Sequence, residues 1–317
     1  MPDPLRRRLR AKAVMAASSA SRFFPRPLIH GALRGLARAA GLTRFETQIQ
    51  SNLAQVLGNE LSAPERAKLG REVRLHCARL VEEWLFLSRA RHGSRERASV
   101  EAWLDATVRF DASCDELFLR TRQGRGALIA TAHLGNWEVL AAALRRRGLD
   151  GAVVGLRKHR DPGADWLVRM REGLAVRTIA QDAPPREVLG VLRSGGTLGL
   201  LCDLEVRRLA GVHAPFFGIP ALTQTAPAAL ARAARTSILP VRCVARPSGY
   251  VVYADAPLEL SADLPRAEAA LDLLTRLNAT YERWIREDLA QWAWHQPRWR
   301  TRPGERAAPP LHSRRAT

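Results

Sequence analysis

One short segment of the sequence brings together residues that could carry acid–base chemistry. His133 follows the apolar run 127–132, and Gly135, Asn136 and Glu138 come shortly after it. When a carboxylate binds one nitrogen of an imidazole, the other nitrogen can take a proton from a substrate hydroxyl. Positions five apart point in different directions on one continuous helix, so His133 and Glu138 can meet only across a turn, which Gly135 permits. We therefore predict a strand, a turn and then a helix, with Glu138 as the partner of His133.

The same pair could be purely structural, because a histidine at a strand end can simply bind a local carboxylate. Its position favours chemistry, since the ligands of open α/β sheets collect beyond the carboxyl ends of the strands. The N-terminus of the following helix would also offer backbone N–H groups to a developing oxyanion.

The elements that must position this segment alternate along the second half of the chain. Short apolar runs predict strands near residues 127–132, 152–155, 197–202, 238–244 and 250–253. Helical patterns fall near residues 136–147, 163–173, 184–194, 222–236 and 266–290. Continuously apolar strands separated by helices are typical of buried parallel sheets. We therefore expect an α/β fold with a central, mostly parallel sheet flanked by helices.

Residues 209–231 contain no Asp, Glu, Lys or Arg and could be mistaken for a membrane span. Pro215, Pro220 and Pro227 interrupt the segment. A transmembrane helix needs about 20 predominantly apolar residues, so we expect a buried loop that leads into a helix.

The N-terminal part is predicted to contain helices near residues 28–41, 44–57 and 63–90. The first is amphipathic, with an apolar face and a basic stripe. The apolar face contains Ile29, Leu33, Leu36, Ala37 and Ala40, and the stripe contains His30, Arg34 and Arg38. This helix could lie on an anionic membrane, or its apolar face could dock on the rest of the fold. We expect residues 1–95 to form a helical, membrane-associating region, residues 96–303 the α/β domain and residues 304–317 a disordered tail.

The charge balance indicates which classes of partner the chain could bind. The chain has 50 Lys and Arg residues against 31 Asp and Glu, a net charge of +19, which suits nucleic acid, anionic lipid head groups or an acidic protein. The four cysteines are scattered and have no histidine at ligand spacing, so we expect reduced thiols and no metal site. They are Cys77, Cys114, Cys202 and Cys243.

The run H-L-G-N-W-E at 133–138 closely resembles the signature of the bacterial lipid A late acyltransferases, which are related to the glycerolipid acyltransferases with H-x-x-x-x-D. Further motifs follow in that family's order: G-L-R at 155–157, P-F-F-G-I-P-A-L-T at 215–223 and W-A-W-H-Q-P-R-W-R-T-R-P at 292–303. The resemblance covers about residues 45–303. It departs at Leu204, where Gln is common, and at Gln296-Pro297, which interrupts a basic pair.

The resemblance implies an O-acyltransferase that moves a fatty acyl chain from an acyl thioester to a hydroxyl of a lipid, with His133 as general base. The donor would be acyl-carrier protein or acyl-CoA. The acceptor would be a lipid A precursor, or else another glycolipid, phospholipid or aminolipid. No cofactor is expected. The implied location is the cytoplasmic face of the inner membrane, where the protein would be peripheral or weakly anchored on anionic lipids.

The resemblance also implies the site residues. His133 and Glu138 would be catalytic, and the substrate-binding set would be Arg157, Arg169, Asn136, Asp203, Phe217 and Gly218. A guanidinium offers a planar fork of donors to phosphate, although any one Arg in so basic a chain could be a solvated surface residue. Asp203 would order the site by pairing with an Arg. Phe217 and Gly218 would shape the pocket wall or simply pack in the core.

A basic nucleic-acid-binding protein is the competing class. It would account for the charge and for the alternation of Arg and Trp at 298–302. It leaves H-L-G-N-W-E and P-F-F-G unexplained, so no nucleic-acid partner is expected.

Overall fold

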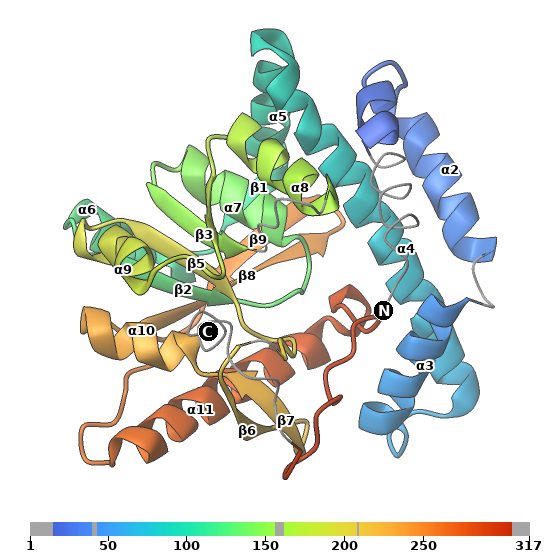
Figure 1. The fold of residues 1–317 in the computed structure, drawn as a ribbon. Coiled ribbons are helices and arrows are strands. Elements are labelled where there is room, and N and C mark those ends of the chain that lie inside the picture. Colours follow the sequence, from blue (N-terminus) through green and yellow to red (C-terminus); the bar gives the residue numbers. More distant parts are fainter. Residues whose placement is uncertain (1–14, 40–42, 156–161, 208, 306–317) are drawn as a thin grey trace, which may run out of the picture.

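The computed structural model describes residues 15–39, 43–155, 162–207 and 209–305, and it has an α/β architecture (Figure 1). A seven-stranded sheet lies at its centre, in the strand order β1-β9-β8-β2-β5-β3-β4. Its strands are β1 (Val108–Phe110), β2 (Ala127–Thr131), β3 (Gly151–Gly155), β4 (Arg177–Ala180), β5 (Thr197–Leu201), β8 (Ile238–Arg246) and β9 (Gly249–Ala254). Neighbouring strands are parallel except for the antiparallel pair β8 and β9. The predicted central, mostly parallel sheet is confirmed.

Helices cover both faces of the sheet because its strands are apolar on both sides. They are α5 (Ser94–Thr107), α6 (Asp115–Arg122), α7 (Trp137–Arg146), α8 (Pro162–Gly173), α9 (Pro185–Arg193), α10 (Ala226–Ala234) and α11 (Arg266–Glu287). Successive strand residues point to opposite faces. On β2, Leu128 shares a core cluster with Trp284 of α11, whereas Ile129 shares another with Leu140 of α7. The strand that leads to His133 is therefore held between two cores.

Three further helices lie beside the sheet: α2 (Arg26–Ala39), α3 (Arg44–Leu57) and α4 (Ala63–Leu87) (Figure 1). The start of α4 is capped by Ser62 and Glu65, since the backbone N–H of Ser62 donates to the Glu65 carboxylate at 2.7 Å. Leu53 of α3 and Val73 of α4 belong to the same buried cluster as one face of the sheet. These helices therefore share the core of the α/β part.

The prediction of a buried loop at 209–231 is wrong, because this segment contains a β-hairpin. Strands β6 (Gly211–Phe216) and β7 (Ile219–Gln224) pair antiparallel and lead into α10. The turn between them is Phe217-Gly218, with φ of +53° and +70°. Positive φ at both positions gives the two-residue turn whose twist matches that of the strands. Because proline cannot donate to a strand ladder, Pro215 and Pro220 led us to predict a loop here. In the hairpin these two prolines face each other.

Candidate active site

His133 lies on the turn after β2, with its imidazole against a buried carboxylate. Its Nδ1 lies 2.8 Å from Asp203 Oδ1, and its backbone N–H donates to Asp203 Oδ2 at 2.9 Å. The Asp203 side chain is fully buried, whereas 25% of the His133 side chain is exposed. An ionised carboxylate can only accept, so Nδ1 carries the proton in this contact and Nε2 is left as the basic nitrogen.

The two residues meet because β2 and β5 are neighbouring parallel strands. Thr131 and Leu201 pair at the ends of these strands, and His133 and Asp203 each follow two residues later. Both side chains therefore lie at the carboxyl edge of the sheet, where the ligands of such folds bind.

Asp203 remains ionised despite its burial. Burial alone would raise the pKa of its carboxyl, but the charge and hydrogen bonds of His133 and the indole N–H of Trp292 outweigh burial and lower the pKa below its usual value. Trp292 Nε1 lies 2.8 Å from Asp203 Oδ2. Both carboxylate oxygens are thus hydrogen-bonded, as a buried charge requires.

Glu138 is not the partner of His133, so the predicted contact between them is wrong. Its carboxylate binds Arg171 of α8 through two hydrogen bonds, Nε to Oε2 at 2.8 Å and Nη2 to Oε1 at 2.6 Å. Both side chains are almost completely buried. Burial disfavours the charged guanidinium, yet the nearby Glu138 carboxylate leaves the pKa of Arg171 raised. Among the described residues, Asp203 is hydrogen-bonded to His133 and Trp292. Its predicted pairing with an arginine stays a prediction, since Arg157 lies outside those residues.

Asn136 is fully buried and caps α7, so the substrate contact predicted for it disagrees with its position. Its Oδ1 accepts from the backbone N–H groups of Glu138 and Val139, both at 3.2 Å. Its Nδ2 donates to Glu83 of α4 at 2.7 Å. Two of the first-turn N–H groups that we expected to bind an oxyanion are therefore used by the helix cap. The site still lies at the positive end of the α7 dipole.

Gly135 gives the turn its shape. Its φ is +62°, and a Cβ added there would lie 1.9 Å from the carbonyl oxygen of Cys243, so only glycine fits. Its N–H donates to the carbonyl of Gln291 at 3.0 Å, and its carbonyl accepts from His76 Nε2 at 3.1 Å. Burial lowers the pKa of His76 to about 4. Segments from both ends of the chain thus fix the turn that carries His133.

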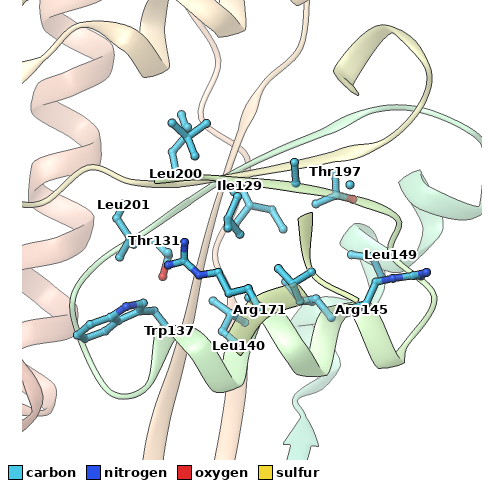
Figure 2. A pocket seen from close by; sticks show the side chains of 18 of the residues that line it. Ile129, Thr131, Trp137, Leu140, Arg145, Leu149, Arg171, Thr197, Leu200 and Leu201 are labelled. Atoms are coloured by element: carbon cyan, nitrogen blue, oxygen red, sulfur yellow. The ribbon is translucent and has the colours of Figure 1, made fainter. Parts of the chain in front are cut away.

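An apolar cavity, partly open to solvent, begins beside this turn. Figure 2 shows its lining side chains spread along β2, β5 and α7. Trp137, Thr131 and Leu201 lie at one end, and Arg145, Leu149 and Thr197 lie at the other (Figure 2). The Trp137 ring meets the His133 ring edge-on, with the centroids 4.8 Å apart. One end of the cavity is therefore lined by Trp137, whose ring contacts the imidazole.

The remaining predicted site residues are dispersed. Arg157 lies outside the described residues, and Arg169 is exposed on α8. Phe217 is half-buried under Arg286, whose Cζ lies 5.3 Å from the ring centroid, and Gly218 completes the hairpin turn. Phe217 and Gly218 are absent from the lining of the apolar cavity among the described residues.

Sequence reasoning missed two residues that complete the site, Arg171 and Trp292. One signal could have paired His133 with Asp203, because each follows an apolar strand by two residues. Trp292 gave no comparable signal, since nothing local indicates which distant carboxylate its indole reaches.

Two classes of feature are missing from the ranges that the structure describes. Across those ranges, no three or more His, Cys, Asp or Glu side chains are grouped so as to hold a metal ion. Within the same ranges, every helix is too short or too polar to cross a membrane.

A strand-end histidine held by a buried carboxylate, beside an apolar cavity, is an arrangement suited to an acid–base enzyme acting near an apolar group. Residues 4–301 match the family described as bacterial lipid A biosynthesis acyltransferase, and the chain belongs to this family of acyltransferases. It is 26% identical over 284 residues to a phosphatidylinositol mannoside acyltransferase of Mycolicibacterium smegmatis, covering 88% of this chain and 87% of that protein. It is 25% identical over 210 residues to a lipid A biosynthesis acyltransferase of Haemophilus influenzae, covering 64% of this chain and 65% of that protein.

Proposed function

We propose that the protein transfers a fatty acyl chain from an acyl thioester to a hydroxyl of a lipid A precursor, with His133 as the general base. The observation that carries the proposal is the contact between His133 Nδ1 and the buried Asp203 carboxylate. It leaves Nε2 free of the proton that Nδ1 carries, on a side chain that solvent and substrate can reach.

In the proposed reaction, Nε2 of His133 takes the proton of the acceptor hydroxyl while the hydroxyl oxygen attacks the thioester carbonyl carbon. A tetrahedral oxyanion forms and collapses as the carbon–sulfur bond breaks. The imidazolium then gives its proton to the leaving thiolate. Asp203 acts as a positioning residue that holds the imidazole in the required tautomer and stabilises its cation. No covalent acyl-enzyme is required.

The apolar cavity supports an acyl donor, because pockets lined by apolar side chains suit hydrocarbon ligands. The proposed donor is acyl-carrier protein or acyl-CoA, and the net charge of +19 would complement an acidic carrier. Arg157 and Arg169 are proposed to bind phosphate groups of donor or acceptor. The exposed position of Arg169 on α8 leaves its guanidinium accessible.

Helix α2 supports a position on the surface of a membrane. Ile29 packs on the core, so part of the predicted apolar face docks on the fold. A second apolar stripe faces outward, and its exposed members are Leu28, Gly31, Ala32, Gly35, Leu36 and Ala39. Phe23 and Phe24, which precede it, are 71% and 53% exposed. We propose that this stripe inserts among anionic lipids at the cytoplasmic face of the inner membrane, with nearby Arg residues at head-group level.

The proposal is tested by acyl transfer with the purified full-length protein. The donor is acyl-carrier protein or acyl-CoA, and the acceptors are a lipid A precursor and, as the alternative glycolipid, a phosphatidylinositol mannoside. General base catalysis contributes about 10²–10⁴-fold, so His133→Ala should lose at least about a hundredfold in kcat. The control His92→Ala, at a histidine between α4 and α5 that has no role in the proposed reaction, should keep its activity. Near-wild-type turnover of His133→Ala would refute the base. If acyl transfer occurs only to the phosphatidylinositol mannoside, this lipid is the acceptor in place of the lipid A precursor.

A further inference from the structure

We propose that Gly199 and Arg145 set the length of the acyl chain, Gly199 by leaving the cavity open and Arg145 by closing its far end. The inference rests on the proposed function, because it needs the apolar cavity to hold the acyl chain of the donor.

Gly199 lies in the middle of β5, where any longer side chain would stand in the cavity. It lines the cavity together with Thr197 and Leu201, which lie two residues to either side and therefore on the same face. Glycine inside a strand weakens the strand and often marks the close approach of a ligand. A Cβ at Gly199 would lie 3.3 Å from Val153 Cγ1, so alanine needs only a small shift, and a larger side chain must enter the cavity.

Arg145 lies at the end of the cavity opposite Trp137 (Figure 2). Its Nε donates to the carbonyl of Ala175 at 3.1 Å, so the side chain bridges α7 and the turn after α8. Ala175 and Gly151 line a separate hollow, and Gly151 lines both this hollow and the apolar cavity. Removing the Arg145 side chain should therefore open the cavity into the hollow.

The distance between the two ends predicts the length of the chain. The pairs Thr131–Leu201 and Ala127–Thr197 mark the two ends and lie four strand residues apart, which is about 13 Å at about 3.3 Å per residue. Along α7, the distance from Trp137 to Arg145 is about 12 Å at about 1.5 Å per residue. An extended hydrocarbon advances roughly 1.3 Å per carbon, given a bond of about 1.5 Å. The cavity therefore holds about ten carbons.

The test measures binding against chain length, without turnover. Full-length protein is titrated with S-alkyl pantetheine thioethers of about 6 to about 18 carbons, which carry the arm common to CoA and acyl-carrier protein and cannot transfer an acyl group. Each buried methylene should lower Kd about fourfold, the equivalent of about 0.8 kcal/mol. For the wild-type protein, the gain should stop near about ten carbons. Arg145→Ala should move this break to longer chains by two carbons or more. Gly199→Val should move it to about half the wild-type length.

The matched control is Arg146→Ala. Arg146 is the neighbour of Arg145 on α7 but binds Glu101 and Asp105 on the outer surface, so the break should stay in place. Gly199→Ala serves if the valine variant does not fold, and it should shorten the preferred chain by a smaller amount. Folded Arg145 and Gly199 variants with an unmoved break would overturn the proposal while leaving the proposed function intact. If no thioether binds the wild-type protein, the donor site itself is misplaced, and the proposed function fails with this inference.

Discussion

Replacing Asp203 by asparagine would test the proposed role of the contact between His133 and Asp203 without removing the packing of the side chain. Asp203 Oδ2 accepts both the His133 backbone N–H and the Trp292 indole N–H, whereas Oδ1 faces His133 Nδ1. An asparagine with its oxygen in place of Oδ2 keeps both of these hydrogen bonds. Its NH₂ group then faces Nδ1, which must accept. The imidazole is forced into the opposite tautomer, with its proton on Nε2, and that nitrogen can no longer act as the base.

The loss of the negative charge of Asp203 is a second reason to expect lower activity in this variant. In the transition state the imidazole becomes cationic, and opposite charges about 4 Å apart at an effective dielectric of about 20 attract by about 4 kcal/mol. This energy corresponds to about a thousandfold in rate. Because a quarter of the His133 side chain is exposed, solvent screens part of the interaction. We expect Asp203→Asn to lower kcat by about a hundred- to a thousandfold.

The assay is steady-state acyl transfer combined with thermal melting, and Glu138→Gln is the comparison. Glu138 neutralises buried Arg171, and breaking such a pair costs about 3–5 kcal/mol. The main effect of Glu138→Gln should therefore be a decrease in melting temperature, on the order of 10 °C. If Asp203→Asn keeps wild-type kcat, or if Glu138→Gln loses the same activity at native stability, then the assignment of Asp203 as the positioning partner is refuted.

Three further perturbations follow from the geometry. Gly135→Ala should destabilise the protein by at least about 1–3 kcal/mol in chemical denaturation, because its Cβ would overlap the Cys243 carbonyl. The control Gly190→Ala, with no atom within 4 Å of its Cβ, should not be destabilised. Equal free energies of unfolding for the two variants would contradict this prediction. The pKa of His76 is lowered from 6.5 to about 4, so its contribution to stability is present above pH 6.5 and is lost as the pH falls toward 4, by up to about 1.4 kcal/mol per pH unit. Unfolding followed by denaturant across this range should show a shallower pH dependence for His76→Gln, and an unchanged slope would exclude His76 as a source. The double variant Leu28→Asn, Leu36→Asn should lose the salt-resistant part of sedimentation with anionic vesicles, whereas Leu271→Asn, at an exposed leucine of α11, should not; identical sedimentation would exclude the α2 stripe as the insertion surface.

Local pattern was enough to predict the strand–turn–helix at His133, because each part has its own signal. The apolar run marks β2, Gly135 marks the turn, and α7 begins one residue after the predicted start. The α3 bounds also agree with the prediction, since they depend on periodicity within one helix.

The partner of His133 could not be predicted from the same pattern. Glu138 is nearby in sequence, but Asn136 caps α7 and Arg171 binds the Glu138 carboxylate. Asp203 reaches His133 only because β5 lies beside β2, and strand order is a property of the whole sheet. The signal for Glu138 was local, whereas the contact that formed depends on the tertiary structure.

The support that Trp292 gives to Asp203 has a consequence for the order in which the site is made. The ribosome makes His133 and Asp203 well before the residues that hold them in place. The Trp292 indole N–H donates to the Asp203 carboxylate, and the Ala293 N–H donates to the His133 carbonyl. A ribosome that has completed α10 has made His133 and Asp203 but has still to make α11 and the segment that follows it. Until Trp292 has emerged, the growing chain would thus lack one hydrogen-bond donor to the carboxylate that is buried in the complete fold. Activity should therefore appear only once residues 292 and 293 have been made, rather than increase gradually before that point.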